Sequence, residues 1–129
     1  MLACGIVEAH DNTLKIGIIS PKGDGIAVLA GESHEESIRL AFTHLPPLQV
    51  GKLLIKLDLI PWNDNGLPEK AALGALHLVH EEHVVALLGP VNSGSTKETL
   101  KMLREQQIEL PVISALSTAP ELTDSGLRD

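Results

Sequence analysis

Two short segments rich in hydroxyl side chains are the best candidates for chemistry or ligand binding. The first is Gly89 to Thr96 (GPVNSGST) and the second is Ser114 to Glu121 (SALSTAPE). Each follows an apolar run and precedes a helical pattern, so each is predicted to be a loop that leads into a helix. Hydroxyl groups in such a loop can act as nucleophiles, bind a phosphate or hold a carboxylate.

Nucleophilic catalysis and phosphate binding both fit the first segment poorly. A nucleophile elbow needs G-x-S-x-G, but Val91 stands where the first glycine would be, and no histidine is placed as a base. A P-loop needs a lysine directly after its second glycine, and Lys97 comes two residues late. A phosphoacceptor domain needs an aspartate where Gly89-Pro90 stands. The sequence therefore predicts a protein that is not an enzyme.

Anion binding without chemistry fits both segments better. Ser95-x-x-Glu98 matches a capping box, in which the serine satisfies the helix's own amides. This interpretation leaves Ser93 free at the positive end of the helix, where a carboxylate would accept its hydrogen bond. Ser117 and Thr118 repeat the arrangement in the second segment, where Thr118 also matches a capping box. The alternative that both loops are only helix caps stays open.

The elements that must position these loops alternate between strand and helix. Strands are predicted at residues 14–20, 52–59, 84–88 and 112–116, and helices at 32–45, 68–82 and 95–106. This order predicts an α/β fold, a doubly wound, flavodoxin-like parallel sheet of order 2-1-3-4 with helices on both faces. Ligands of such sheets bind at the carboxyl ends of the strands, where both hydroxyl-rich loops and the predicted loop from Pro21 to Gly31 lie.

Composition and charge exclude several classes of function. The 129 residues suit a single domain, 1–129, and the formal net charge of −7 with no basic run argues against binding nucleic acid. No apolar stretch approaches the roughly eighteen residues of a membrane span. Cys4 is the only cysteine, which rules out an intrachain disulfide. The start MLACG is similar to the end of a bacterial lipobox, so Cys4 is a candidate lipid anchor, with an incidental thiol as the alternative.

Histidine and tryptophan side chains supply two weaker candidates. His77, His80 and His83 recur every third residue beside two glutamates. They could hold a surface metal, but a solvated helix end favoured by the helix dipole explains them better, so no metal or other cofactor is predicted. Trp62 is expected to pack within its loop, with a role in lining a ligand site as the alternative.

The segment from Val84 to Asp124 strongly resembles the type I periplasmic binding proteins of the leucine/isoleucine/valine-binding kind. Members carry (I/L)GP-x-x-S after the third strand and P-x-I-S-x-x-(A/S)-T-x-P-x-L after the fourth. This chain has LGPVNS and PVISALSTAPEL at those places. The match upstream is looser but collinear, with Asp64 at a recurrent acidic position, so the resemblance covers essentially the whole chain.

The resemblance implies roles for particular residues. By position, Ser93 would donate its hydroxyl to a ligand carboxylate, and Thr118 would donate through its hydroxyl and its amide. Val91 and Leu116 would offer carbonyl groups, with Leu116 facing the ligand's ammonium group. Leu29 stands near where many relatives place an aromatic residue over the ligand. The full candidate set is Leu29, Val91, Asn92, Ser93, Leu116, Ser117 and Thr118.

The resemblance also implies a biological setting. It implies the amino-terminal lobe of a periplasmic or extracellular solute-binding protein of an ABC transporter, with the permease as a partner. The expected ligand is a branched-chain amino acid or a similar small carboxylated solute. A second lobe is expected to be absent from these residues, and the unfinished sheet edge could pair in a homodimer. The alternatives are a ligand-sensing regulatory domain of the same fold and, less favoured by the motifs, a hydrolase.

Overall fold

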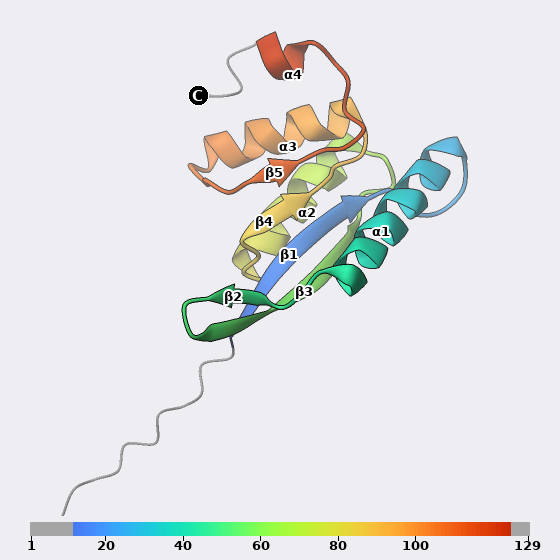
Figure 1. Cartoon of the computed structure of the whole chain (residues 1–129). Coiled ribbons are helices and arrows are strands. Elements are labelled where there is room, and N and C mark those ends of the chain that lie inside the picture. Colours follow the sequence, from blue (N-terminus) through green and yellow to red (C-terminus); the bar gives the residue numbers. More distant parts are fainter. Residues whose placement is uncertain (1–11, 125–129) are drawn as a thin grey trace, which may run out of the picture.

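The computed structural model of the protein describes residues 12–124, with strands and helices alternating along the chain (Figure 1). The elements are β1 (Thr13–Ser20), α1 (Ile26–His44), β2 (Leu48–Val50), β3 (Leu53–Asn63), α2 (Pro68–His80), β4 (Ala86–Leu88), α3 (Ser93–Glu105), β5 (Val112–Ile113) and α4 (Glu121–Asp124). α1 covers one face of the sheet, while α2 and α3 cover the other (Figure 1). The predicted doubly wound architecture is therefore confirmed.

The sheet has the order β2-β3-β1-β4-β5. The pairs β1–β3, β1–β4 and β4–β5 are parallel, and these four strands reproduce the predicted order 2-1-3-4. β2 was not predicted, because three residues directly after Pro47 carry no strand signal of their own. It forms as the antiparallel partner of β3 across a two-residue turn, in which Gly51 has a positive φ of 61°.

The core lies between the sheet and the pair α2–α3. Ile19, Leu78 and Leu87 are fully buried there, and small residues of α2 let the helix approach closely. At Gly74 a Cβ atom would collide with the indole of Trp62. Trp62 Nε1 donates to Lys70 O over 3.1 Å, and its ring centre lies 5.0 Å from that of His77. Trp62 therefore packs from β3 against α2, and the expectation that it packs within its loop is wrong because β3 extends to Asn63.

Several elements extend beyond their predicted bounds. α1 begins at Ile26, six residues before the predicted start, so the loop after β1 ends at Gly25, which has a φ of 112°. Gly31, which was expected to belong to that loop, lies inside α1, where its missing side chain makes room for Pro21. β3 continues to Asn63 rather than ending at 59, because its last residues still pack on α2.

The loop after β1 is held in place from both sides. Lys22 N donates to Asn63 Oδ1 over 2.8 Å, and Lys22 Nζ lies 2.8 Å from Glu35 Oε2 of α1. Arg39 contacts the other oxygen of Glu35 at 2.7 Å. Burial raises the pKa of Glu35, but these two cations outweigh it, so the pKa lies below its ordinary value. The loop is thereby fixed at the carboxyl edge of the sheet, next to the candidate site.

Candidate ligand-binding site

The first hydroxyl-rich loop leads from β4 into α3, whose N-cap is Asn92. Asn92 Oδ1 accepts a hydrogen bond from Ser95 N over 2.8 Å, so an asparagine takes the N-cap role that the predicted capping box gave to Ser95. The capping-box prediction for Ser95 is wrong, because α3 begins two residues earlier, at Ser93. Asn92 therefore has a structural role at the start of the helix.

Ser93 joins the two hydroxyl-rich loops directly. Its Oγ accepts hydrogen bonds from Thr118 N over 3.1 Å and from Ala119 N over 3.2 Å. A serine hydroxyl has two acceptor lone pairs and one proton, so both lone pairs are used and the proton is left to donate. The sequence predicted that Ser93 would donate to a ligand, but it did not reveal this contact, which also engages the amide of Thr118.

Ser117 belongs to a second link between the same loops. Its Oγ lies 2.7 Å from Thr96 Oγ1 of α3 and 2.6 Å from Ser114 Oγ. Ser114 Oγ in turn donates to Pro90 O over 2.6 Å. These three hydroxyl groups form a compact cluster that fixes the second loop against the first. Ser117 therefore holds the two loops together, and its predicted contact with a ligand stays a prediction.

The other candidate residues differ in how open they are. The side chain of Thr118 is exposed, and Leu116 is 50% exposed beside it. Val91 is buried, and only its backbone carbonyl accepts a weak contact of 3.5 Å from Ser117 Oγ. Leu29 lies in the first turn of α1 and is 66% exposed. The hydrogen bonds that join the loops bring Ser93, Ser117 and Thr118 together, and Leu29 takes no part in them.

Asp64 is a buried carboxyl group in the loop between β3 and α2. It ends up fully buried just after β3, where its Oδ1 accepts a hydrogen bond from Gly66 N over 2.8 Å. Burial raises the pKa of Asp64 above its ordinary value, while the hydrogen bond from Gly66 N acts in the opposite direction. Ser95 is itself fully buried. Asp64 thus fixes the turn of the β3–α2 loop through the amide of Gly66.

Lys97 and Glu121 form an ion pair between α3 and α4. Lys97 Nζ lies 3.3 Å from Glu121 Oε2, and this contact links α3 to α4, the short helix that follows the second loop. The pKa of Glu121 lies below its ordinary value because its own backbone N–H and Lys97 both favour the charged carboxylate. The lysine that stands two residues out of place for a P-loop thus has a structural partner.

Two further kinds of feature are absent from the part of the chain that the structure describes. Within residues 12–124, no group of three His, Cys, Asp or Glu side chains could hold a metal ion. Over the same range, no helix combines the length and the apolar character needed to cross a membrane.

Comparison with known proteins identifies the class. A family model described as periplasmic binding protein matches residues 13–127, so the chain belongs to the periplasmic binding protein family. This agrees with the fold and with the position of the two loops at the carboxyl edge of the sheet. The family and its structural neighbours are binding proteins rather than enzymes. No curated protein matches the chain.

Three solved structures illustrate the similarity. A leucine-binding protein, LivK, from Thermotoga maritima is 25% identical, with a TM-score of 0.71 over 86% of this chain and 30% of that one. LivJ from Streptococcus pneumoniae, in complex with isoleucine, is 23% identical, with a TM-score of 0.74 over 88% and 31%. A solute-binding protein from Rhodopseudomonas palustris, in complex with benzoate, is 25% identical, with a TM-score of 0.71 over 86% and 29%. The chain therefore spans less than a third of each neighbour's length.

Proposed function

We propose that the chain is the amino-terminal ligand-binding lobe of an extracytoplasmic solute-binding protein that serves an ABC transporter. Its ligand would be a small carboxylated solute held by the loops that follow β4 and β5. The transporter permease would be its partner in transport. The candidate lipid anchor at Cys4 lies outside the described residues and stays a prediction.

The observation that carries this proposal is the hydrogen bonding of Ser93. Two amides from the second loop occupy its acceptor positions, which leaves its proton as the group it can offer. That proton lies at the amino end of the 13-residue helix α3, where the helix dipole favours a negative charge. The partner that suits such a donor is an anionic acceptor, of which a carboxylate is the simplest.

The neighbouring groups favour a carboxylate on an apolar body. The hydroxyl of exposed Thr118 offers a second donor, and half-exposed Leu116 offers an apolar surface next to it. Two acidic residues that flank these loops are otherwise engaged, since Glu121 pairs with Lys97 and Asp64 is buried. One neighbour is a leucine-binding protein and another is in complex with benzoate, and leucine and benzoate both combine a carboxylate with an apolar group.

A thermal-shift screen of the full-length protein against amino acids and small aromatic acids tests this function. A ligand that binds the folded state alone raises the melting temperature, by an amount that grows with its concentration. We expect a shift with a free carboxylate and none with the matching amide or methyl ester. Equal shifts with the acid and with its ester would contradict a carboxylate site.

A further inference from the structure

An exposed apolar surface lies at the turn between β2 and β3. Leu48, Val50, Leu53 and Leu54 are each between 42% and 62% exposed, although they occupy one short stretch of chain. We call the stretch from Leu48 to Leu54 the hairpin tip. Isolated exposed leucines are ordinary, but a continuous group of this size is typical of an interaction surface. In Figure 1 the hairpin projects from the body of the protein.

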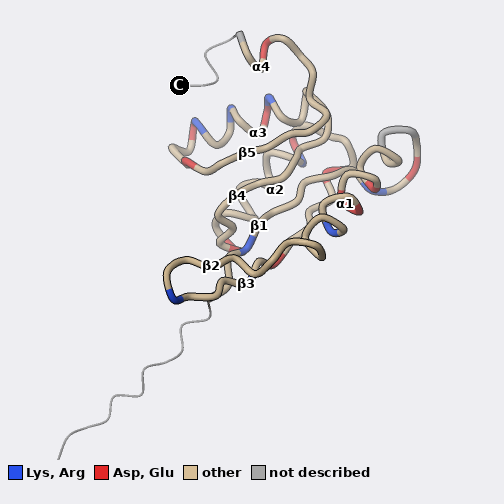
Figure 2. Tube along the Cα trace, viewed as in Figure 1, with Lys and Arg blue, Asp and Glu red and all other residues tan. Residues whose placement is uncertain are grey.

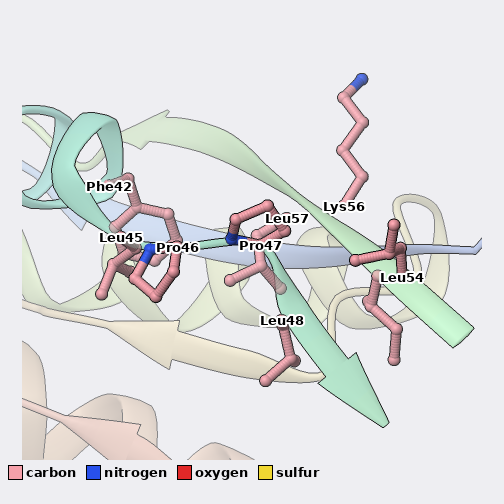
Figure 3. Close-up of a pocket in the computed structure, with 9 residues that line it drawn as sticks. Phe42, Leu45, Pro46, Pro47, Leu48, Leu54, Lys56 and Leu57 are labelled. Carbon is pink, nitrogen blue, oxygen red and sulfur yellow. The ribbon is translucent and has the colours of Figure 1, made fainter. Parts of the chain in front are cut away.

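The apolar surface continues from the hairpin tip onto the end of α1. A groove of ≈ 410 Å³ lies between them, lined by Phe42, Leu45, Pro46, Pro47, Leu48, Leu54, Ile55, Lys56 and Leu57. In Figure 3, several apolar side chains lie close together where the chain passes from α1 to β2, and Lys56 points away from them. These are Phe42, Leu45, Pro46, Pro47 and Leu57, while Leu48 and Leu54 lie further along the hairpin. The surface thus combines a wide apolar area with a basic side chain at its margin.

The charge of this region differs from that of the whole protein. Residues 45–57 contain Lys52 and Lys56 and no acidic residue, whereas the chain carries a formal net charge of −7. Lys52 lies in the turn itself, and Figure 2 shows only basic charge there. Lys56 lies 3.1 Å from Asp58 and forms an ion pair with it. The positive charge of the hairpin tip itself therefore comes from Lys52. An apolar tip with a lysine at its apex fits an anionic surface.

The hairpin tip also lies far from the candidate ligand-binding site. The site is at the carboxyl ends of β4 and β5, whereas the tip is at the amino end of the parallel strands, beside the start of β1 (Figure 1). Lys56 N donates to Asn12 O over 2.8 Å, so the described chain begins next to the hairpin. A surface bound at the tip would leave the ligand site facing away from it.

A second copy of the chain fits this edge less well than a bilayer does. β2 offers only three residues for pairing with another strand, and Pro47 directly before it has no N–H to donate. Proline and a short length are features that natural proteins use to prevent pairing at sheet edges. A stable protein interface buries about 1,200–2,000 Å² with a complementary partner, while a bilayer accepts a small projecting apolar tip without shape matching.

We propose that the hairpin tip docks on a bilayer that contains anionic phospholipid. Val50, Leu53 and Leu54 enter the interface between headgroups and acyl chains, and Lys52 contacts the phosphate groups. This inference goes beyond the proposed function and does not depend on it, since it concerns the opposite end of the sheet.

Vesicle co-sedimentation tests the proposal with the full chain carrying Cys4→Ser, so that no acyl chain can be attached. We expect binding to vesicles of phosphatidylglycerol and phosphatidylcholine in equal parts, weaker binding in high salt, and little binding to phosphatidylcholine alone. Lys52→Glu should weaken partitioning by about tenfold or more, because it reverses a charge at the surface. The double change Leu53→Ser with Leu54→Ser should weaken it at least as much.

Matched controls separate the hairpin tip from the rest of the surface. Lys101→Glu on α3 reverses an exposed lysine, and Leu73→Ser on α2 removes an exposed leucine, so both should leave vesicle binding unchanged. Circular dichroism and thermal melting should show that every variant is folded. Absence of vesicle binding by the parent chain, or equal loss in the controls, would overturn the proposal. So would a hairpin-dependent dimer, seen by sedimentation, that does not bind vesicles.

A fluorescent label gives a second readout that reports the depth of the tip. Cys4 is the only cysteine, so Val50→Cys in the Cys4→Ser background creates a unique site for an environment-sensitive dye. We expect its emission to shift to the blue when anionic vesicles are added. The same dye at Leu73→Cys should not shift. An unchanged spectrum at position 50, with the protein bound to vesicles, would show that another face makes the contact.

Discussion

Ser93 Oγ accepts the amide hydrogen of Thr118, a residue 25 positions further along the chain, over a distance of 3.1 Å. This bond joins the first turn of α3 to the loop after β5, and it fixes how Ser93 can meet a ligand. With its lone pairs occupied, the hydroxyl offers only its proton. The same bond uses the amide of Thr118, which the sequence predicted would bind the ligand. In this arrangement the hydroxyl of Thr118 is the group that can still donate to a ligand.

Replacing Ser93 tests the centre of the site. We expect Ser93→Ala to weaken binding of a carboxylated ligand by roughly tenfold to a hundredfold, because a hydrogen bond to a charged group contributes about 1.5–3 kcal/mol. The loss of the bonds to Thr118 N and Ala119 N should also lower the free energy of unfolding by about 1 kcal/mol. Calorimetric titration and denaturant unfolding measure the two effects. Ser37→Ala, at an exposed position of α1, is the control and should change neither.

Thr118 separates a ligand contact from a structural one. The side chain is exposed, so Thr118→Ala should leave the melting temperature nearly unchanged, yet weaken ligand binding by about tenfold through loss of the hydroxyl. Thr118→Ser keeps the hydroxyl and should bind close to normally. Calorimetry on the three proteins distinguishes the cases. Equal affinity in all of them would remove the Thr118 hydroxyl from the site.

Asp64 makes the stability of the protein depend on pH in a particular direction. Burial raises the pKa of Asp64 above its ordinary value of 3.8, so the folded state holds the proton more tightly than the unfolded state does. As pH rises from 3.8 through the folded pKa, this group therefore lowers the free energy of unfolding. Asp64→Asn keeps an oxygen for Gly66 N but cannot ionise.

Denaturant unfolding of the parent chain and of Asp64→Asn at a series of pH values measures this effect. Other carboxyl groups titrate in both proteins, so their contributions cancel in the difference. We expect the difference to move in favour of the asparagine variant as pH rises above 3.8. A difference that stays constant from acid to neutral pH would contradict the raised pKa.

A substitution at Gly74 tests the packing of Trp62 against α2. Alanine normally stabilises a helix relative to glycine by about 1 kcal/mol. At this position, however, the added Cβ would collide with the indole of Trp62, so we expect Gly74→Ala to lower the free energy of unfolding by about 1–3 kcal/mol. Gly94→Ala in α3 is the control, because its Cβ would meet Asn92 Oδ1 only at 3.5 Å. Thermal unfolding should rank Gly74→Ala below the parent chain and Gly94→Ala at or above it.

Local patterns in the sequence were sufficient to predict the order of the four parallel strands and the edge of the sheet where the two hydroxyl-rich loops lie. The apolar runs and the helical periodicity predicted the four parallel strands and their order, because each pattern reflects which face of an element is buried. The motifs around Ser93 and Thr118 placed both loops at the carboxyl edge of the sheet. The short strand β2 was missed, because its formation depends on a partner strand rather than on its own residues.

The sequence by itself determined the fold class, the family resemblance and the residue types at the two loops. Only the tertiary structure decided what each hydroxyl does there. Asn92, rather than Ser95, caps α3, and Ser117 holds the loops together with Thr96. Ser93 bonds to amides 25 and 26 residues away. A hydroxyl can donate or accept with equal ease, so its role is set by neighbours that folding brings from distant parts of the chain.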